Sequence, residues 1–463
     1  MEGRAWEGTF GQEQFGLAEL GDKRRTARLV RLADKIASHP GGTLPDKVND
    51  PASLKALYRL MDCRTVTHVS VLAAPLQRTR EKMAAAEETV LVIHDDTELD
   101  FTGLKSLDEL GKIGNGSRRG YLAHNVLAVT AETREVLGLA YQHLAKRPKT
   151  ARKESRKQRR DRPDRESRCW KRASEQLPAA PSRRRYVEVA DRGADLLEFL
   201  DFVESRNKNY LVRSKHNRCI CLENGAKTKL HDFARGLPEG GRRTVEVAGT
   251  DKRRPRSATV AVSWARVTLL IPKQPRGEVR GIPLTTWVVY LREIDPPAGV
   301  EPLEWILLTN VPVTSFAEAC QRIDWYGGRW VIEEYHKGMK TGCQIEDMQF
   351  TEEPRLQPAI ALLSVVAVSL LNLRDTSRRP DAHVQPATAF FPVFLVLVLS
   401  LWRFRERRTD LTVHEFCYAL ARLGGHQNRK GDHRPGWLVL WRGWTKLQAM
   451  AEHAHSLEEE RCG

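Results

Sequence analysis

The sequence has no apolar run that reaches the ~20 residues needed by a membrane-spanning helix. Its two prominent apolar stretches, 359–373 and 389–402, are shorter and are predicted to be buried helices. The N-terminus is charged and has no apolar signal-peptide core. We therefore expect a cytoplasmic protein with no membrane partner.

Cysteine is sparse and irregularly placed, with eight residues in a chain of 463. Cys219 and Cys221 form a C-x-C pair, but no second pair lies at zinc-finger spacing. This pattern excludes a disulfide-stapled scaffold and a zinc finger. The thiols are predicted to be reduced and structural.

Acidic residues are outnumbered: 75 Lys and Arg face 59 Asp and Glu, a net charge of +16. Such an excess favours a polyanionic partner, nucleic acid before a membrane surface. The segment 146–172 alone carries 14 basic and four acidic residues. It is read either as a solvated charge run or as a phosphate-gripping arm, entering a helix near Trp170.

The chain is long enough for two to four domains, and an apolar fraction of 41% can build a substantial core. The first part is predicted to be helical, with helices at 20–38, 51–61 and 69–86. In the helix at 20–38, Asp22 is the expected N-cap. One face carries Arg24, Arg28, Arg31 and Lys35, which is typical of phosphate contact, although an ordinary amphipathic surface helix has a similar pattern.

The hydrophobic period then changes to that of strands. Strands are predicted at 89–94, 121–131, 135–142, 186–190 and 210–214, with a helix at 196–203. Further strands at 244–247, 258–264, 285–291 and 305–308 form a β-rich insertion at about 217–311. From residue 315 onwards the pattern is mainly helical.

One stretch, 325–340, carries chemistry on a helical period. At ~100° per residue, Tyr326, Arg329, Glu333 and Lys340 fall within about 60° of one face. A carboxylate flanked by two cations and a phenol suits a metal ion beside a phosphate. Gly327 and Gly328 weaken a helix by roughly 1 kcal/mol each. An alternative prediction is therefore that the helix begins near Arg329 and that Tyr326 lies on a turn before it.

Two aspartates are predicted at strand ends, Asp95 after 89–94 and Asp191 after 186–190. With Glu333 they make three carboxylates that can hold two divalent cations, Mg²⁺ or Mn²⁺. This arrangement resembles that of ribonuclease-H-like nucleotidyl transferases. Asp96 adjoins Asp95, and alternate strand residues face opposite ways, so either could be the ligand; the register favours Asp95.

These residues also carry a family resemblance. The spacing Tyr326, Arg329, Glu333, Lys340 matches the Tyr-Arg-Glu-Lys signature of the IS-four family of bacterial insertion-sequence transposases. Asp95-Asp96-Thr97 resembles the family's Asp-x-Thr at its first catalytic aspartate, and 191–195 resembles the segment at its second. The likeness covers nearly the whole chain, including 20–29, 212–216, 302–309, 423–425 and 440–444.

The resemblance implies an α/β fold with a ribonuclease-H-like (retroviral-integrase-like) mixed-sheet catalytic core. It implies a helical N-terminal DNA-binding domain at 1–74 and the catalytic core with its β-rich insertion at 75–374. A helical C-terminal dimerisation domain is expected at 375–463, although a helical cap on the core has the same sequence pattern.

The implied function is that of a cut-and-paste DDE transposase. Asp95, Asp191 and Glu333 would be catalytic and would hold two Mg²⁺ (or Mn²⁺) ions per active site. The implied partners are double-stranded DNA, both transposon end inverted repeats and target DNA, and a second copy of the chain in the synaptic complex. The protein would lie in the bacterial cytoplasm, on the nucleoid when bound to DNA.

The resemblance also implies DNA contacts. Trp305 and Trp330 match tryptophans that handle a base flipped out during hairpin formation, although Trp305 is equally well read as a core residue. The full set of implied DNA-contacting residues is Arg24, Arg25, Arg28, Arg213, Lys215, Trp305, Tyr326, Arg329, Trp330, Lys337 and Lys340.

Two other functions compete with this one. The first is a catalytically inactive DNA-binding relative or inhibitor, which the retention of all three acids disfavours. The second is a stand-alone ribonuclease-H-like nuclease, which the basic N-terminal helix and the insertion bearing Trp305 disfavour.

Overall fold

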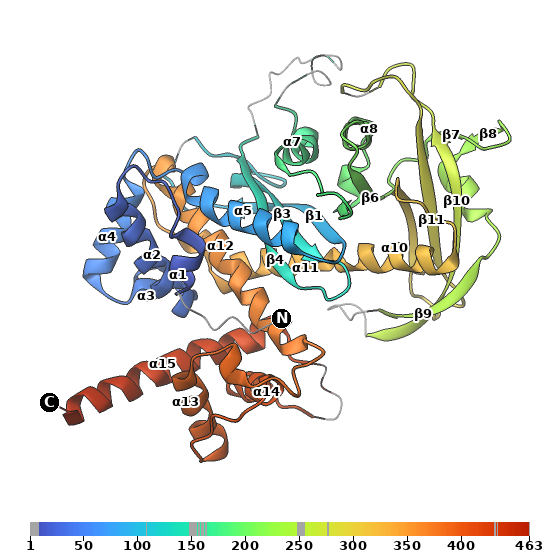
Figure 1. Ribbon diagram of the computed structural model, residues 1–463. Helices are drawn as coiled ribbons and strands as arrows, with labels where there is room; N and C mark the ends of the chain where they lie inside the picture. The colour runs from blue at the N-terminus through green and yellow to red at the C-terminus, as the bar shows by residue number, and fades with distance from the viewer. Residues whose placement is uncertain are drawn as a thin grey trace.

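The computed structural model describes residues 9–107, 109–147, 155, 158, 162, 164–247, 255–275, 277–429, 432 and 434–462. The described strands form one mixed sheet of 12 strands. Helices gather at both ends of the chain: in Figure 1 the N-terminal helices lie to the left of the sheet, and the C-terminal helices lie below it.

The N-terminal part is helical, as its amphipathic pattern predicts. Asp22 caps α2 by accepting a hydrogen bond from the Arg24 N–H at 2.8 Å, which confirms it as the N-cap. The apolar stripe of α2, including Leu29, Leu32 and Ile36, is buried. The helices of this part are α1 (Phe10–Phe15), α2 (Lys23–Ser38), α3 (Leu44–Val48), α4 (Pro51–Met61) and α5 (His68–Ala85).

Helix α5 connects the N-terminal helices to the sheet. It packs against β4 and α12 and is itself continuous from His68 to Ala85. The boundary proposed at residue 74 lies within this helix.

The sheet has the order β2-β3-β1-β5-β6-β12-β11-β10-β7-β8, with β4 paired to β3 and β9 paired to β10. Its strands are β1 (Val90–Asp100), β2 (Gly111–Lys112), β3 (Arg119–Thr130), β4 (Val136–Ala145), β5 (Tyr186–Ala190), β6 (Asn209–Arg213), β7 (Cys219–Cys221), β8 (Lys227–Lys229), β9 (Gly241–Val247), β10 (Arg256–Leu269), β11 (Leu284–Glu293) and β12 (Glu304–Thr309).

Strands β1, β5 and β6 are parallel neighbours, and β3 runs antiparallel on the other side of β1. The apolar start of β1 is buried because helices cover the sheet there. Crossover helices α7 (Cys169–Gln176) and α8 (Leu197–Ser205) precede β5 and β6 respectively. The end of β5 therefore lies beside the middle of β1, where Ala190 is the partner of His94.

The strands of the predicted insertion do not form a separate sheet. β12 pairs antiparallel with β6, and β11, β10 and β7 follow it outwards. Helix α9 (Leu230–Arg235) belongs to the same stretch. The insertion thus extends the central sheet, as the right-hand side of Figure 1 shows.

Helix α10 (Phe316–Gly328) returns the chain along the sheet towards β1 (Figure 1). It is followed after Arg329 by α11 (Trp330–Lys337) and by a π-helical turn, Gly338–Gly342. Tyr326 lies inside α10, so the alternative in which it stands on a turn before the helix is wrong. The two glycines end α10 without breaking the helical path, because Arg329 keeps right-handed helical angles.

Helix α12 (Glu353–Arg378) contains the first apolar stretch and is 26 residues long. By length and composition it could cross a membrane, but 78% of its most apolar window is buried inside the protein. It packs against α5 and β4, as expected of a buried core helix. The boundary proposed at residue 374 lies within it.

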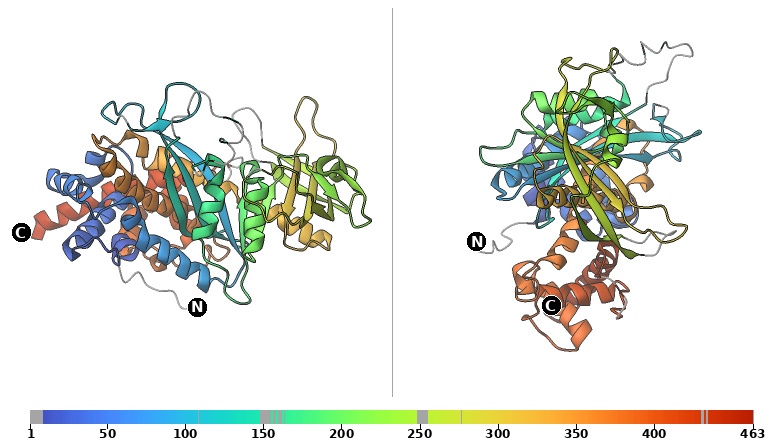
Figure 2. Two further views of the ribbon diagram at one scale, coloured as in Figure 1. Left: turned by 90° about the horizontal axis from the view of Figure 1, so that it is seen from above. Right: turned by 90° about the vertical axis from the view of Figure 1, so that its right-hand side faces the viewer.

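The C-terminal part contains α13 (Val393–Phe404), α14 (Val413–Leu423) and α15 (Trp437–Cys462). These helices lie to one side of the sheet (Figure 2). The prediction that the second apolar stretch is buried is only half right. Leu395, Val396 and Leu399 are buried, whereas Val393 and Leu401 are 50% and 46% exposed, because the other helices cover one side of α13 only.

Candidate active site

Three carboxylates from distant parts of the sequence converge beside β1. Asp95 lies on β1, Asp191 directly follows β5, and Glu333 lies on α11, which packs against β1. The Arg329 guanidinium joins two of them: it donates to Asp95 Oδ2 at 2.9 Å and lies 3.5 Å from Glu333 Oε1. Asp95 and Glu333 therefore meet in the tertiary structure, and Asp191 lies near enough for its charge to raise the pKa of Asp95.

The pKa of Asp95 is affected by the charges of both other acids. Burial raises the pKa of Asp95 to about 7, the Arg329 charge lowers it, and the charges of Glu333 and Asp191 raise it further. Asp95 thus carries a charge that the folded chain alone stabilises poorly. A cation between these carboxylates would relieve that cost.

The sequence predicts Asp95 directly after the end of its strand, and this prediction is wrong. Strand β1 continues to Asp100, so Asp95 lies in the strand interior. The strand is longer than its β-branched run because its pairing with β3 extends as far as Gly120. Pairing with β3, not side-chain propensity, holds Asp95 in place.

The choice between Asp95 and Asp96 is settled by the two faces of β1. Asp95 faces Arg329 and Glu333, whereas the Asp96 carboxylate lies 2.5 Å from His124 Nδ1. Successive strand residues point to opposite faces. Asp95 is therefore the aspartate of the carboxylate cluster.

His336 is a site residue that sequence reasoning missed. It follows Glu333 by three positions, and ligand atoms of His336, Glu333 and Asp95 lie within 4.8 Å of one another. Asn125, the partner of Asp95 on β3, lies 3.1 Å from His336 Nε2 and orients the ring. Burial lowers the pKa of His336 to about 3, so the imidazole is neutral. The spacing of three on one helix face was the available signal.

The four-residue face of 325–340 is spread out along β1. Arg329 lies at Asp95, while Lys340 lies 3.7 Å from Glu346 Oε1. The same Glu346 oxygen accepts a hydrogen bond from the Asp100 N–H at 2.8 Å. Asp95 and Asp100 are about 17 Å apart along an extended strand. Arg329 and Glu333 therefore act at the cluster, and Lys340 lies towards the end of β1.

Tyr326 and Trp305 form a buried aromatic pair rather than two exposed contacts. Their ring centroids are 4.9 Å apart in an edge-to-face arrangement. Tyr326 is 6% exposed and Trp305 is partly buried, whereas Trp330 is 61% exposed. Of the two tryptophans, Trp330 is the one whose indole is free for stacking.

The remaining cations near this end of the sheet differ in exposure. Arg213, at the end of β6, is half-buried and donates to the Glu304 carbonyl at 2.8 Å. Lys215 and Lys337 are exposed. Arg192, next to Asp191, is exposed as well and was not singled out from the sequence.

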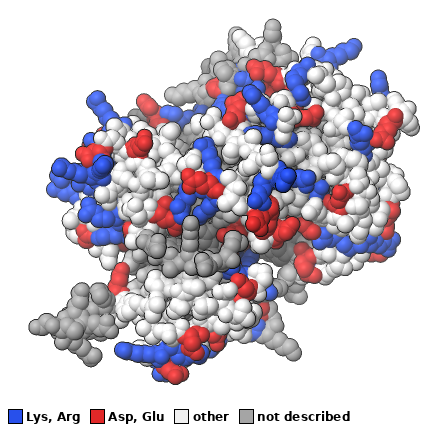
Figure 3. Space-filling view, in the orientation of Figure 1, with Lys and Arg blue, Asp and Glu red and all other residues white. Residues whose placement is uncertain are grey.

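On the basic side of α2, some cations are exposed and others are bound to neighbouring groups of the protein. Arg24 is exposed and Arg28 is partly exposed, whereas Arg25 donates to the Leu20 carbonyl at 3.1 Å and to Thr65 at 2.8 Å. Lys35, expected on the phosphate-facing stripe, is ion-paired with Asp50. Lys and Arg gather over the N-terminal helices at the left edge of Figure 3.

The basic segment 146–172 lies partly outside the described residues. Its described ends are ion-paired: Lys146 with Glu353 at 3.0 Å, and Arg147 with Glu166 at 2.9 Å. Lys171, on α7, pairs with Glu278 at 3.1 Å. The two ends are thus anchored to the folded protein.

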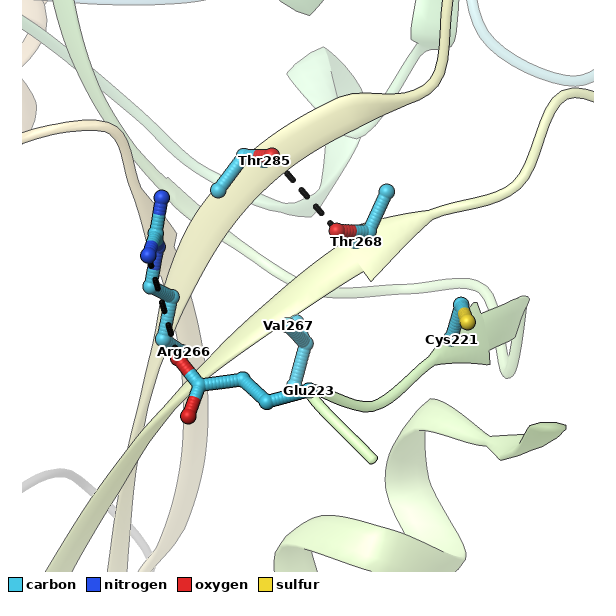
Figure 4. Close-up of a pocket in the computed structure, with 6 residues that line it drawn as sticks. All are labelled: Cys221, Glu223, Arg266, Val267, Thr268 and Thr285. Atoms are coloured by element: carbon cyan, nitrogen blue, oxygen red, sulfur yellow. Dashed lines mark hydrogen bonds and ion pairs between the residues drawn. The ribbon is translucent and has the colours of Figure 1, made fainter. Parts of the chain in front are cut away.

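The described residues also line a pocket of about 170 Å³ at the outer edge of the sheet, between β7, β10 and β11 (Figure 4). Arg266 and Glu223 lie 3.8 Å apart there. The carboxylate cluster is on other strands, so this pocket is separate from it.

Comparison with known protein families agrees with the N-terminal reading. Residues 8–66 match the family model described as transposase DNA-binding. The matched region spans α1 to α4, including the basic helix α2. The match supports a transposase that binds DNA, and it suggests a DNA-cleaving enzyme.

Proposed function

We propose that this chain is a cut-and-paste DDE transposase similar to those of the IS-four family. One observation carries the proposal: Asp95, Asp191 and Glu333 converge in a chain whose residues 8–66 match a transposase DNA-binding domain. DNA binding and phosphoryl transfer would thus be joined in one molecule.

A ribonuclease-H-like core is part of this proposal. In its support, β3 and β1 are antiparallel neighbours, and β1, β5 and β6 follow as parallel strands. One acid lies on β1, the second directly follows the adjacent strand β5, and the third comes from a helix that packs on the sheet.

The donor set fits hard divalent cations. The carboxylate oxygens of Asp95, Asp191 and Glu333 are ligands that Mg²⁺ and Mn²⁺ prefer. The raised pKa of Asp95 is the observation that favours a cation there. Two such ions would activate the attacking water or 3′-hydroxyl and stabilise the leaving oxygen.

The other residues would bind and orient the DNA. Arg329 already lies between Asp95 and Glu333, where a scissile phosphate would need a positive partner. Exposed Lys215 and Lys337 would hold the flanking backbone. The exposed indole of Trp330 would stack on a flipped base.

In the proposed reaction a transposon end is nicked, and the freed 3′-hydroxyl attacks the opposite strand to give a hairpin. The hairpin is reopened, and the same hydroxyl attacks target DNA. A homodimer would pair two transposon ends through the helical C-terminal part, in the bacterial cytoplasm. The exposed side of α13 leaves apolar surface available for such pairing.

The test uses end-labelled DNA carrying the inverted repeats that flank the gene, with Mg²⁺. We expect hairpin ends and strand transfer, and we expect Glu333→Ala to abolish both while DNA binding persists. Asp324→Asn is the matched control, because Asp324 is an exposed acid on α10 paired with Arg243.

The competing functions give different products in this assay. Nicks without hairpins or strand transfer would identify a nuclease, and binding without cleavage would identify an inactive relative. Cleavage that survives Glu333→Ala would show that the proposed site is wrong.

A further inference from the structure

A second cluster of metal-ligating side chains lies on the face of β1 opposite to Asp95. Asp96 from β1, His124 from β3 and Cys169 from the first turn of α7 bring ligand atoms within 4.8 Å of one another. Asp96 Oδ1 lies 2.5 Å from His124 Nδ1, and Asp96 Oδ2 lies 3.6 Å from Cys169 Sγ. His124 and Cys169 are 1% and 6% exposed.

A buried polar chain continues from this cluster across the same face of the sheet. His124 Nε2 lies 3.3 Å from His94 Nδ1, and His94 Nε2 lies 3.3 Å from Glu188 Oε2. Glu188 also accepts from Ser174 Oγ at 2.7 Å. The chain Asp96–His124–His94–Glu188 thus has three contacts between two carboxylates and two imidazoles.

The contacts of this chain differ from one end to the other. His94 Nε2 and Glu188 Oε2 lie 3.3 Å apart, but neither atom makes a hydrogen bond. Asp96, at the other end, has the His124 ring nitrogen against one carboxylate oxygen and the Cys169 thiol against the other. Three side chains that can each offer one ligand atom to a metal ion therefore surround one buried position.

The donor set selects the cation. A thiolate, an imidazole and a carboxylate suit Zn²⁺, whereas Mg²⁺ prefers oxygen ligands alone. With Asp96 and the Cys169 thiolate each carrying one negative charge, a bound Zn²⁺ makes the buried cluster neutral. His143 of β4 is the cross-strand partner of His124 and is a further candidate ligand.

We propose that Asp96, His124 and Cys169 form a structural zinc site. Its ligands tie the start of α7, which lies within the C-terminal end of the basic segment 146–172, to β1 and β3. Holding Asp96 on one face of β1 also fixes Asp95 on the other face. His94 and Glu188 orient the His124 ring, as outer partners do in protein zinc sites. The site is distinct from the proposed Mg²⁺ cluster and does not depend on the proposed function.

The test is a Co²⁺ titration of the metal-stripped full-length protein in excess Mg²⁺, which occupies the oxygen-only ligands. Cys219 and Cys221 are replaced by Ser throughout, because this C-x-C pair is partly exposed. We expect one Co²⁺ per chain with a thiolate-to-metal charge-transfer band in the near ultraviolet, displaced by one Zn²⁺. This measurement needs no change at the proposed site, and the absence of the band would overturn the proposal.

Substitutions then locate the ligands. Cys169→Ser should remove the band, and Asp96→Asn should lower Zn²⁺ affinity by at least the ~10–100-fold that loss of an outer partner costs. Cys417→Ser is the matched control, because Cys417 is a buried thiol in the core of the C-terminal helices. Near-ultraviolet circular dichroism checks the fold of each variant. A band that persists in Cys169→Ser and disappears in Cys417→Ser would assign the metal elsewhere.

Discussion

The clearest quantitative consequence of the carboxylate cluster is a pH-dependent stability cost at Asp95. Its pKa is raised from 3.8 to about 7, mainly by burial, with its side chain 14% exposed. A shift of about three units corresponds to about 4 kcal/mol, an upper limit because proteins relax around buried charges. Replacing Asp95 by Asn should therefore stabilise the metal-free protein at pH 8 by up to about 4 kcal/mol.

The sign follows from proton binding. Because the folded-state pKa of Asp95 lies above the unfolded value, the folded protein binds more protons between about pH 4 and pH 7. The stability of the wild-type protein should fall as pH rises through this window, and Asp95→Asn should lack this part of the fall. Below pH 4 the two proteins should be equally stable.

Urea unfolding in EDTA at intervals from pH 4 to pH 8 measures the effect. Glu301→Gln, which replaces an exposed acid before β12, is the control for a simple loss of charge. Adding Mg²⁺ at pH 8 should stabilise the wild-type protein and leave Asp95→Asn nearly unchanged. A difference between the two proteins that does not change with pH, or a less stable variant at pH 8, would refute the reasoning.

Further predictions concern the residues that are proposed to contact DNA. Arg28→Ala should weaken DNA binding and reduce the salt slope of the affinity by about 1, as measured by fluorescence anisotropy. Arg25→Ala should instead lower the melting temperature, because its guanidinium holds Leu20 and Thr65; an unchanged melting temperature would contradict this role. Trp330→Ala should change stability by less than about 0.5 kcal/mol yet reduce hairpin yield about 5–150-fold, the equivalent of ~1–3 kcal/mol of stacking. Trp305→Ala should cost about 3 kcal/mol in unfolding free energy, since the indole packs on Tyr326, and an equal loss for both tryptophans would count against the distinction.

Local patterns in the sequence predicted local elements well. The Asp22 cap and α4 were found because capping residues and apolar periods act within a few residues. The strand at 186–190 was predicted with its exact bounds, since a short β-branched run between polar residues is typical of a strand. Asp191 was accordingly placed at a strand end, as the structure has it.

Contacts between distant segments were not readable in this way. The extension of β1 through Asp95 depends on β3, and Tyr326 is buried by Trp305, which is 21 positions earlier in the sequence. Lys35 reads as a phosphate-facing cation until α4 brings Asp50 against it. His336 becomes part of the carboxylate cluster only because Asn125 of β3 orients its ring.

The sequence alone determined the charge of this protein, its main elements, and which acids and cations are candidates for the proposed site, because residue type and spacing fix these properties. The tertiary structure decided which of Asp95 and Asp96 joins Glu333, because the two faces of β1 meet different elements. It also decided that Asp96 meets His124 and Cys169, since α7 packs on that second face. The sequence gives the chemistry of each side chain. Which side chains share a site depends on strand pairing and helix packing between residues that are far apart in the sequence.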